Sequence, residues 1–269
     1  NNFYSTSSGS AFGSAHVYKR DGAGDWNSFD DLIAFNNDST FTNRTFGNTS
    51  FGMTIALQGN ELFVGSGGTT NQGGSALRIF KLNSAGDAFE PSQFVSPEPV
   101  AGDGFSKYGL AVSGDYMIVG AIYDDYNNNT ISNTGAAYIY LRNDSGVWTK
   151  QTHLYGQDPV ASDYFGWSVA IHGDFAMVGA KWKNSPSVGA AFVYERNGTN
   201  WTQIQYILGT GNQFGYAVAM DGDAWLVGEI YEDSGGVVYN YGPNIPIILN
   251  PTPLFFNNNI LTIENSIDQ

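Results

Sequence analysis

A polar loop is the segment of this sequence best suited to hold a ligand. It runs from Tyr123 to Gly135 and reads YDDYNNNTISNTG. Asp124, Asp125 and Asn127 could place several oxygen atoms around a cation, and hard cations such as Ca²⁺ prefer oxygen ligands. The spacing lacks the DxDxDG order of a calcium loop, so a solvated loop is the alternative interpretation. These three residues are the candidates for a metal site, and no cofactor is expected elsewhere in the chain.

Aromatic residues in this loop and in a second loop could contact a ligand through their rings. Tyr123 and Tyr126 flank the acidic pair, and Trp182 lies between Lys181 and Lys183 in the segment AKWKNSP. An exposed tryptophan can stack on a sugar or on another aromatic side chain, and partial burial beneath its own loop is the alternative. Because loops of a repeat scaffold carry binding more often than its strands, Tyr123, Tyr126 and Trp182 are candidate ligand-binding residues.

The three histidines give no indication of a catalytic centre. His16, His153 and His172 lie in different segments, and the sequence has no GxSxG nucleophile motif. The chain also has no cysteine, which excludes thiolate catalysis and cysteine-bound zinc. The sequence therefore predicts a protein that is not an enzyme.

Seven N-x-S/T motifs mark candidate glycosylation sites. All of them fall in predicted loops, hairpins or strand starts, as glycan attachment requires. Asparagine is itself a common turn residue, so this placement has a second explanation. The candidates are Asn37, Asn43, Asn48, Asn128, Asn143, Asn197 and Asn200.

A repeated pattern positions these residues. A first block occurs four times, at spacings of 57, 57 and 49 residues. Its copies are FGMTIALQGNELFVGS from Phe51, YGLAVSGDYMIVGA from Tyr108, FGWSVAIHGDFAMVGA from Phe165 and FGYAVAMDGDAWLVGE from Phe214. A second block of the type GAAFVYER follows each copy, and a fifth copy of it stands alone near the N-terminus, at Gly13. Repeats of about 50 residues are typical of propellers and solenoids.

Each repeat predicts four antiparallel strands. Apolar residues alternate with polar or small ones within each block, which is the period of a β-strand. Gly-Asp or Gly-Asn pairs separate the first two strands, where a tight hairpin needs residues that tolerate positive φ. We interpret the aspartates of these pairs as turn residues that stabilise their own backbone; they are Asp115, Asp174 and Asp223. A repeated four-stranded meander of this length is the blade of a β-propeller.

Two residue types recur where neighbouring blades are expected to meet. Tryptophans begin the fourth strand of three repeats, where aromatic packing between blades is expected; they are Trp26, Trp148 and Trp201. Glycines follow a buried valine where the strands converge on the axis, and a side chain there would collide with the next blade. These glycines are Gly120, Gly179 and Gly228.

The order of the motifs resembles the FG-GAP repeat family, which includes the seven-bladed propeller of integrin α-subunits. Phe-Gly, a Gly-Asp turn, Val-Gly-Ala and Gly-Ala-Ala-aromatic-Val-Tyr recur in this order over roughly residues 3–242. The resemblance implies an extracellular or cell-surface propeller that binds a protein or glycan. Integrin-type repeats carry a calcium loop between their first two strands, whereas this sequence has only GD or GN there, so we do not expect the family's calcium sites.

The predicted organisation is an all-β propeller of four-stranded antiparallel blades over residues 1–242, followed by a proline-rich tail over residues 243–269. Five modules are visible, the first and last are incomplete, and a larger, seven-bladed ring is an open alternative. Their approximate bounds are residues 1–45, 46–101, 102–160, 161–208 and 209–242. The tail carries apolar runs that predict one or two strands, which could complete an open blade, serve as a linker or start a further domain, and it is a candidate for self-association.

Charge excludes several classes of partner. The 269 residues include 25 acidic and 11 basic side chains, for a formal charge of −14, so nucleic acid and anionic membrane surfaces are not expected partners. No run of 18 apolar residues predicts a membrane span. The chain begins at Asn1, so we expect a processed chain or a piece of a longer one.

We therefore predict a secreted or cell-surface adhesion module that recognises a protein or glycan through propeller loops. A structural subunit of an extracellular filament, sheath or surface layer is the alternative, and a polysaccharide-active enzyme is the third class.

Overall fold

The computed structural model describes residues 4–5, 11–33, 50–67, 75–96, 102–126, 129–184, 188–209, 213–222, 224–232, 235–241, 255–257 and 260–262. Within these ranges every regular element is a β-strand, which confirms the predicted all-β class. None of the described residues forms a helix long and apolar enough to cross a membrane.

Five antiparallel sheets, which we call blades 1 to 5, follow one another along the chain, and each of the five modules contributes one. Blade 1 consists of β3 (Ser14–Arg20) and β4 (Trp26–Ile33). Blade 2 consists of β5 (Phe51–Gln58), β6 (Glu61–Ser66), β7 (Ala76–Leu82) and β8 (Phe89–Val95). Blade 3 consists of β9 (Phe105–Ser113), β10 (Tyr116–Ala121), β11 (Ala136–Arg142) and β12 (Trp148–Leu154).

Blade 4 consists of β13 (Phe165–His172), β14 (Phe175–Ala180), β15 (Ala190–Asn197) and β16 (Asn200–Leu208). Blade 5 consists of β17 (Ala217–Asp221), β18 (Ala224–Glu232) and β19 (Gly235–Tyr241). Two short pairs lie outside the blades: β1 (Tyr4–Ser5) with β2 (Ala11–Phe12), and β20 (Phe255–Asn257) with β21 (Ile260–Thr262).

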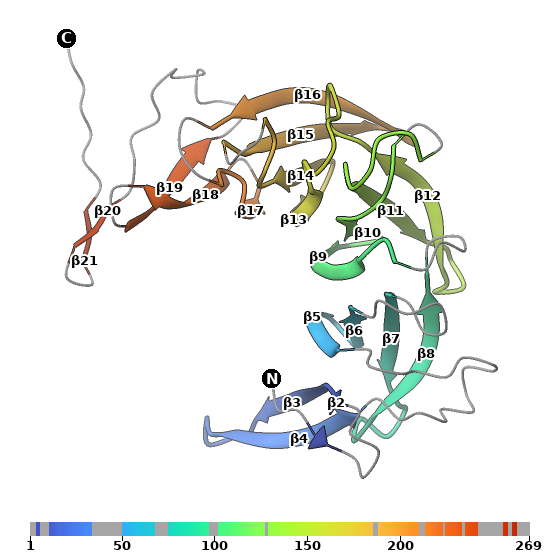
Figure 1. Cartoon of the computed structure of the whole chain (residues 1–269). Helices are drawn as coiled ribbons and strands as arrows, with labels where there is room; N and C mark the ends of the chain where they lie inside the picture. The colour runs from blue at the N-terminus through green and yellow to red at the C-terminus, as the bar shows by residue number, and fades with distance from the viewer. Residues whose placement is uncertain are drawn as a thin grey trace.

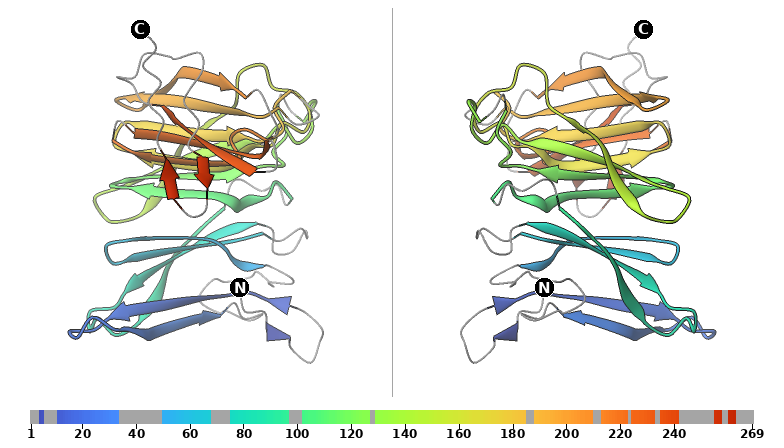
Figure 2. Two further views of the ribbon diagram at one scale, coloured as in Figure 1. Left: turned by 90° about the vertical axis from the view of Figure 1, so that its left-hand side faces the viewer. Right: turned by 90° about the vertical axis from the view of Figure 1, so that its right-hand side faces the viewer.

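The blades are arranged along an open arc, as Figure 1 shows. The first strand of each of blades 2 to 5 lies on the inner side of the arc, and the fourth strands β8, β12 and β16 lie on its outer side (Figure 1). Side views show the blades following one another like the sheets of a propeller, with β3 and β4 at one end (Figure 2). The described residues therefore form propeller-like blades.

The hairpins between first and second strands have the predicted geometry. Their glycines Gly59, Gly114, Gly173 and Gly222 have φ values of 56°, 59°, 57° and 55°. Glycine occupies this left-handed region without the steric cost of a Cβ, so it allows a tight turn between the two strands.

Two of the predicted turn aspartates, Asp115 and Asp174, form ion pairs, whereas Asp223 lies outside the described residues. Arg142 Nε and Nη2 donate to Asp115 Oδ1 over 2.9 and 2.8 Å, and Arg142 Nη1 donates to Glu61 Oε2 of blade 2 over 3.0 Å. Arg196 Nη2 makes the corresponding ion pair with Asp174 Oδ1 in blade 4. These arginines join the first hairpin of a blade to its third strand, and Arg142 also links two blades.

The structure corrects the register of the Phe-Gly motif in blade 3. Phe105, not Tyr108, occupies the phenylalanine position, because it pairs with Ala121 just as Phe165 pairs with Ala180. The next residue, Ser106, has a φ of +57° and is fully buried. The sequence obscures this equivalence because serine replaces glycine and because one extra residue follows.

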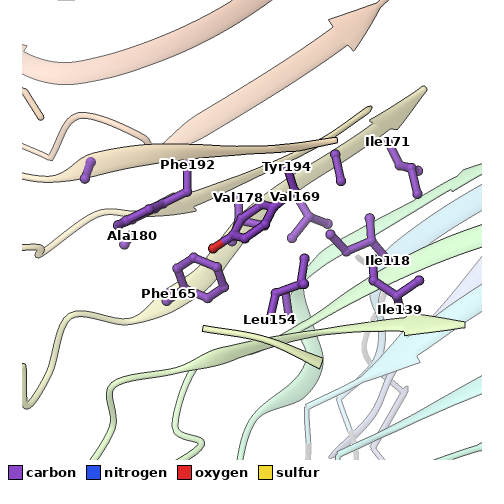
Figure 3. Packing of buried hydrophobic residues seen from close by; sticks show 13 residues of the cluster. Ile118, Ile139, Leu154, Phe165, Val169, Ile171, Val178, Ala180, Phe192 and Tyr194 are labelled. Atoms are coloured by element: carbon purple, nitrogen blue, oxygen red, sulfur yellow. The ribbon is translucent and has the colours of Figure 1, made fainter. Parts of the chain in front are cut away.

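Apolar side chains fill the space between neighbouring blades. Figure 3 shows the cluster between blades 3 and 4, in which the rings of Phe165 and Phe192 are 5.2 Å apart. Trp148 packs across the boundary between blades 2 and 3, with its ring 5.5 Å from Phe63, as predicted. Trp26 differs from this expectation and is 68% exposed, because no blade precedes blade 1 in the described structure.

The predicted contact of the axial glycines with the next blade is confirmed at two of three positions. A Cβ on Gly120 would lie 1.9 Å from the carbonyl oxygen of Gly166, and one on Gly179 would lie 2.0 Å from that of Gly215. At Gly228 the nearest atom would be 3.4 Å away. Blade 5 has no following blade in the described structure, so the crowding that requires glycine is missing there.

Candidate ligand-binding surface

An aromatic row runs along the inner strands of blades 3 to 5. Tyr108 on β9 stacks on Trp167 on β13, with ring centroids 4.1 Å apart and planes at 20°. Trp167 in turn lies 5.6 Å from Tyr216, which directly precedes β17. All three residues come shortly after the Phe-Gly position of their blade. The repeat therefore places one aromatic residue at the same inner position in three successive blades.

A second set of rings follows the second strand of blades 3 and 4. Tyr123 and Trp182 are each two residues beyond the end of that strand. Their backbone N–H groups donate to the carbonyl oxygens of Asp103 over 2.9 Å and Asp163 over 3.3 Å. Tyr164 connects the two rings, with centroids 5.7 Å from Tyr123 and 4.9 Å from Trp182.

Two lysines join the two sets of rings. Lys181 Nζ lies 3.1 Å from the ring centroid of Trp167, 5.0 Å from that of Trp182 and 5.6 Å from that of Tyr216. Lys107 Nζ lies 5.2 Å from the ring centroid of Tyr108 and 5.3 Å from that of Tyr123. We call this group the aromatic–lysine cluster; its members are Tyr108, Tyr123, Tyr164, Trp167, Trp182, Tyr216, Lys107 and Lys181.

The cluster combines half-buried rings with two cations that have no acidic partner in the described part of the chain. Its rings are partly accessible, and Tyr216 is 37% exposed. Lys181 is only 9% exposed, and burial lowers its pKa to about 8. Among the described residues no carboxylate forms an ion pair with Lys107 or Lys181. Cation–π attraction therefore stabilises these ammonium groups without neutralising them.

A buried ion pair supports the loop that carries Trp182. Lys183 is 2% exposed, and its Nζ donates to Asp163 Oδ2 over 2.9 Å and to the carbonyl oxygen of Asp158. The other contact of Asp163 Oδ2 is the backbone N–H of Val160, at 2.8 Å. Lys183 is thus a structural cation, whereas its neighbour Lys181 faces the rings.

The predicted metal residue Asp124 is buried among tyrosines. The hydroxyl of Tyr138 donates to Asp124 Oδ2, and the hydroxyl of Tyr155 donates to Asp124 Oδ1 over 3.2 Å. Burial raises the pKa of Asp124, although these hydrogen bonds oppose the shift. Burial and the negative charges of Asp124 and Asp125 raise the pKa of Asp103 to about 6.

The other predicted residues of this loop have separate environments. Asp125 Oδ1 accepts a hydrogen bond of 2.7 Å from the backbone N–H of Asn133, so it closes the loop on itself. Tyr126 packs edge-on against Tyr155, with centroids 4.9 Å apart. Asn127 lies outside the described residues. In the parts of the chain with described coordinates, no group of three or more histidine or carboxylate side chains could hold a metal ion.

Two of the three ligand-binding candidates, Tyr123 and Trp182, thus lie in one cluster, and Tyr126 lies beside the buried Asp124. The sequence reasoning missed the remaining members of the cluster: Tyr108, Tyr164, Trp167, Tyr216, Lys107 and Lys181. Aligning the repeats on Leu110, Val169 and Val218, which pair with a valine of the second strand, would have indicated the shared inner position of Tyr108, Trp167 and Tyr216. The contacts across blades had no such signal, because they join residues far apart in the chain.

Three of the candidate glycosylation sites fall on described, exposed residues: Asn143, Asn197 and Asn200. Asn143 Oδ1 also accepts hydrogen bonds from the backbone N–H groups of Ser145 and Val147, which shapes the hairpin between β11 and β12. Asn37, Asn43, Asn48 and Asn128 lie outside the described residues.

A family model for the FG-GAP repeat matches the chain twice, at residues 91–140 and 148–194. Each match begins in or at the fourth strand of one blade and extends into the third strand of the next, so the two matches span blades 3 and 4. No curated protein matches the chain. The two matched segments carry most of the aromatic–lysine cluster. Residues 91–140 and 148–194 therefore match FG-GAP repeats, as their motifs indicated.

Proposed function

We propose that this chain is an extracellular binding module and that the aromatic–lysine cluster is its recognition surface. The observation that carries the proposal is the convergence of half-buried rings from three successive blades around two cations that form no ion pair with any described carboxylate. A core would bury these rings fully and would exclude the unpaired charges, since burying an uncompensated charge is costly. Aromatic and cationic groups of this kind are typical of the centres of binding surfaces.

The FG-GAP repeats support the same class of function by family resemblance, and the site itself must supply the ligand because one fold can host many functions. The ligand of such a module is a protein or a glycan. An adhesion role predicts a saturable ligand, whereas an enzyme would need an acid and a base near a reacting group.

Binding to arrays of extracellular proteins and glycans tests this function. The parent chain is compared with the double variant Trp182→Ala/Tyr216→Ala, and Trp26→Ala is the matched control because Trp26 is an exposed aromatic residue on blade 1. We expect binding that the double variant loses and that Trp26→Ala keeps. A chain that binds no array component, or whose binding survives the double variant, would contradict the proposed surface.

A structural subunit is the second candidate, and exposed apolar residues on the inner strand of blade 2 favour it. Ile55 and Leu57 on β5 are each 62% exposed, whereas Val169 and Ile171 at the equivalent positions of β13 are 9% and 6% exposed. Such a surface can mediate association. Light scattering at micromolar concentration, with and without residues 243–269, should reveal polymers if this candidate is correct.

A further inference from the structure

The charge balance around Lys181 indicates what kind of ligand the cluster can take. Its ammonium group is enclosed by rings on blades 4 and 5, and it has no acidic partner among the described residues. Lys183, two residues away, is also buried, but it forms an ion pair with the buried Asp163. At the position of Lys181 that counter-charge is missing from the described residues.

Lys107 of blade 3 has a similar environment. Its ammonium group lies between the rings of Tyr108 and Tyr123 and also has no acidic partner in the described part of the chain. A Cβ added to Gly67 of blade 2 would lie 2.7 Å from Lys107 Cγ, so the neighbouring blade leaves room for this side chain at a glycine. Two lysines on neighbouring blades, neither of them paired with a described carboxylate, thus contact rings of one cluster in a chain of net charge −14.

We infer that the aromatic–lysine cluster binds an anionic sugar, with carboxylate or sulfate groups on Lys181 and Lys107 and a sugar ring against Tyr216, which is 37% exposed. This inference rests on the proposed function and adds the class of ligand. Charge-assisted bonds to ammonium groups are stronger than neutral hydrogen bonds. The partly dehydrated ammonium of Lys181 is well placed to use this gain, because burial has already removed part of its water.

The proportion of rings to charges favours a sugar over an acidic peptide. The cluster has six aromatic rings and two ammonium groups. Flat rings match the apolar C–H faces of a sugar, and two cations match a ligand with few, widely spaced anionic groups. A peptide with a carboxylate on every residue would bring more negative charge than the cluster can balance and would be repelled by the acidic chain.

Titration calorimetry with defined oligomers tests the inference. The probes are trigalacturonic acid, its fully methyl-esterified form, a sulfated galactose oligosaccharide and hexaglutamate. The variants are Lys181→Met and Lys107→Met, which keep an unbranched stem but remove the charge. Lys181→Arg restores the charge, and Lys19→Met is the matched control, because Lys19 lies 5.1 Å from the Phe29 ring centroid on blade 1. Thermal unfolding of each variant shows that the fold is retained.

We expect one of the two anionic sugars to bind, and to lose about tenfold in affinity with either lysine-to-methionine variant. Lys19→Met and Lys181→Arg should bind like the parent, and the methyl ester should bind more weakly than the acid. The identity of the anionic sugar that binds distinguishes a carboxylate ligand from a sulfate ligand. Equal affinity for acid and ester, tighter binding of hexaglutamate, or no binding of either anionic sugar would overturn the inference. Aromatic-dependent binding of a neutral glycan or a protein on the arrays would still uphold the proposed function.

Discussion

Asp124 occupies in blade 3 the position that Lys183 occupies in blade 4. The backbone N–H of Asp124 donates to the carbonyl oxygen of Ala121 over 3.2 Å, and that of Lys183 donates to the carbonyl oxygen of Ala180 over 3.1 Å. The carbonyl oxygens of Asp124 and Lys183 each accept a hydrogen bond from the glycine that precedes the third strand of the blade. Both side chains are buried. One repeat position therefore carries a cation paired with Asp163 in blade 4, and an anion near Asp103 in blade 3.

The first prediction concerns the cation of this pair. Lys183→Met should lower the free energy of unfolding by about 3–5 kcal/mol, because it leaves Asp163 buried without its partner. Urea unfolding measures the change, with the exposed Lys81→Met as control. Adding Asp163→Asn to Lys183→Met should recover part of the loss. If Lys183→Met unfolds at the same urea concentration as the parent, the ion pair does not support the loop.

The second prediction concerns the anions of blade 3. The pKa of Asp103 is about 6 in the folded chain, above the ordinary value of 3.8 that we take for the unfolded chain. The folded state therefore binds the carboxyl proton of Asp103 more tightly than the unfolded state. Its contribution to stability is therefore fully present below about pH 4 and is lost as the pH rises through about 6. Asp103→Asn should remove this loss, so its gain over the parent should grow from pH 4 to pH 6 and then stay constant.

Urea unfolding across this pH range measures the difference, and the exposed Asp144→Asn in the hairpin between β11 and β12 is the control. A difference between Asp103→Asn and parent that does not change with pH would show that Asp103 titrates normally.

The third prediction uses two glycines at equivalent repeat positions. Gly179→Ala should cost about 1–3 kcal/mol or more, because its Cβ would lie 2.0 Å from the carbonyl oxygen of Gly215 in the next blade. Gly228→Ala should stay within about 1 kcal/mol of the parent, since its nearest neighbour is 3.4 Å away. Thermal unfolding compares the two variants, and equal melting temperatures would show that Gly179 does not contact blade 5 as described.

The fourth prediction compares two tryptophans that begin fourth strands. Trp148→Ala should cost about 3–5 kcal/mol, because the 2% exposed ring packs between blades 2 and 3. Trp26→Ala should change stability by about 0.5 kcal/mol or less, because Trp26 is 68% exposed. Denaturant unfolding checks both, and a large cost for Trp26→Ala would mean that another segment covers blade 1.

The fifth prediction concerns calcium. We expect EDTA to leave the melting temperature unchanged, because the tight turns at Gly59, Gly114 and Gly173 offer too few oxygen ligands for the ion. Differential scanning calorimetry with EDTA, and again with added Ca²⁺, checks this. A fall of several degrees would contradict it, and loss of that fall in Asp125→Asn would place the site in the loop of residues 123–135.

The sequence by itself was sufficient for the strands, their order within a blade and the turns between them. These features are local: alternation has a period of two residues, and the glycines of the hairpins are needed wherever φ is positive, as at Gly114 and Gly173. Repetition then multiplied each weak local signal, which is why the FG-GAP resemblance was visible.

Only the tertiary structure decided which residues meet between blades. Tyr108 and Trp167 are 59 positions apart and stack because blades 3 and 4 lie side by side. The same neighbour relation buries Trp148 and leaves Trp26 exposed, although both occupy one repeat position. A residue that recurs in the repeat has the same backbone conformation in each blade, but its burial and its partners depend on the blade that packs against it. The period of the repeat and the composition of the chain carry no information on that neighbouring blade.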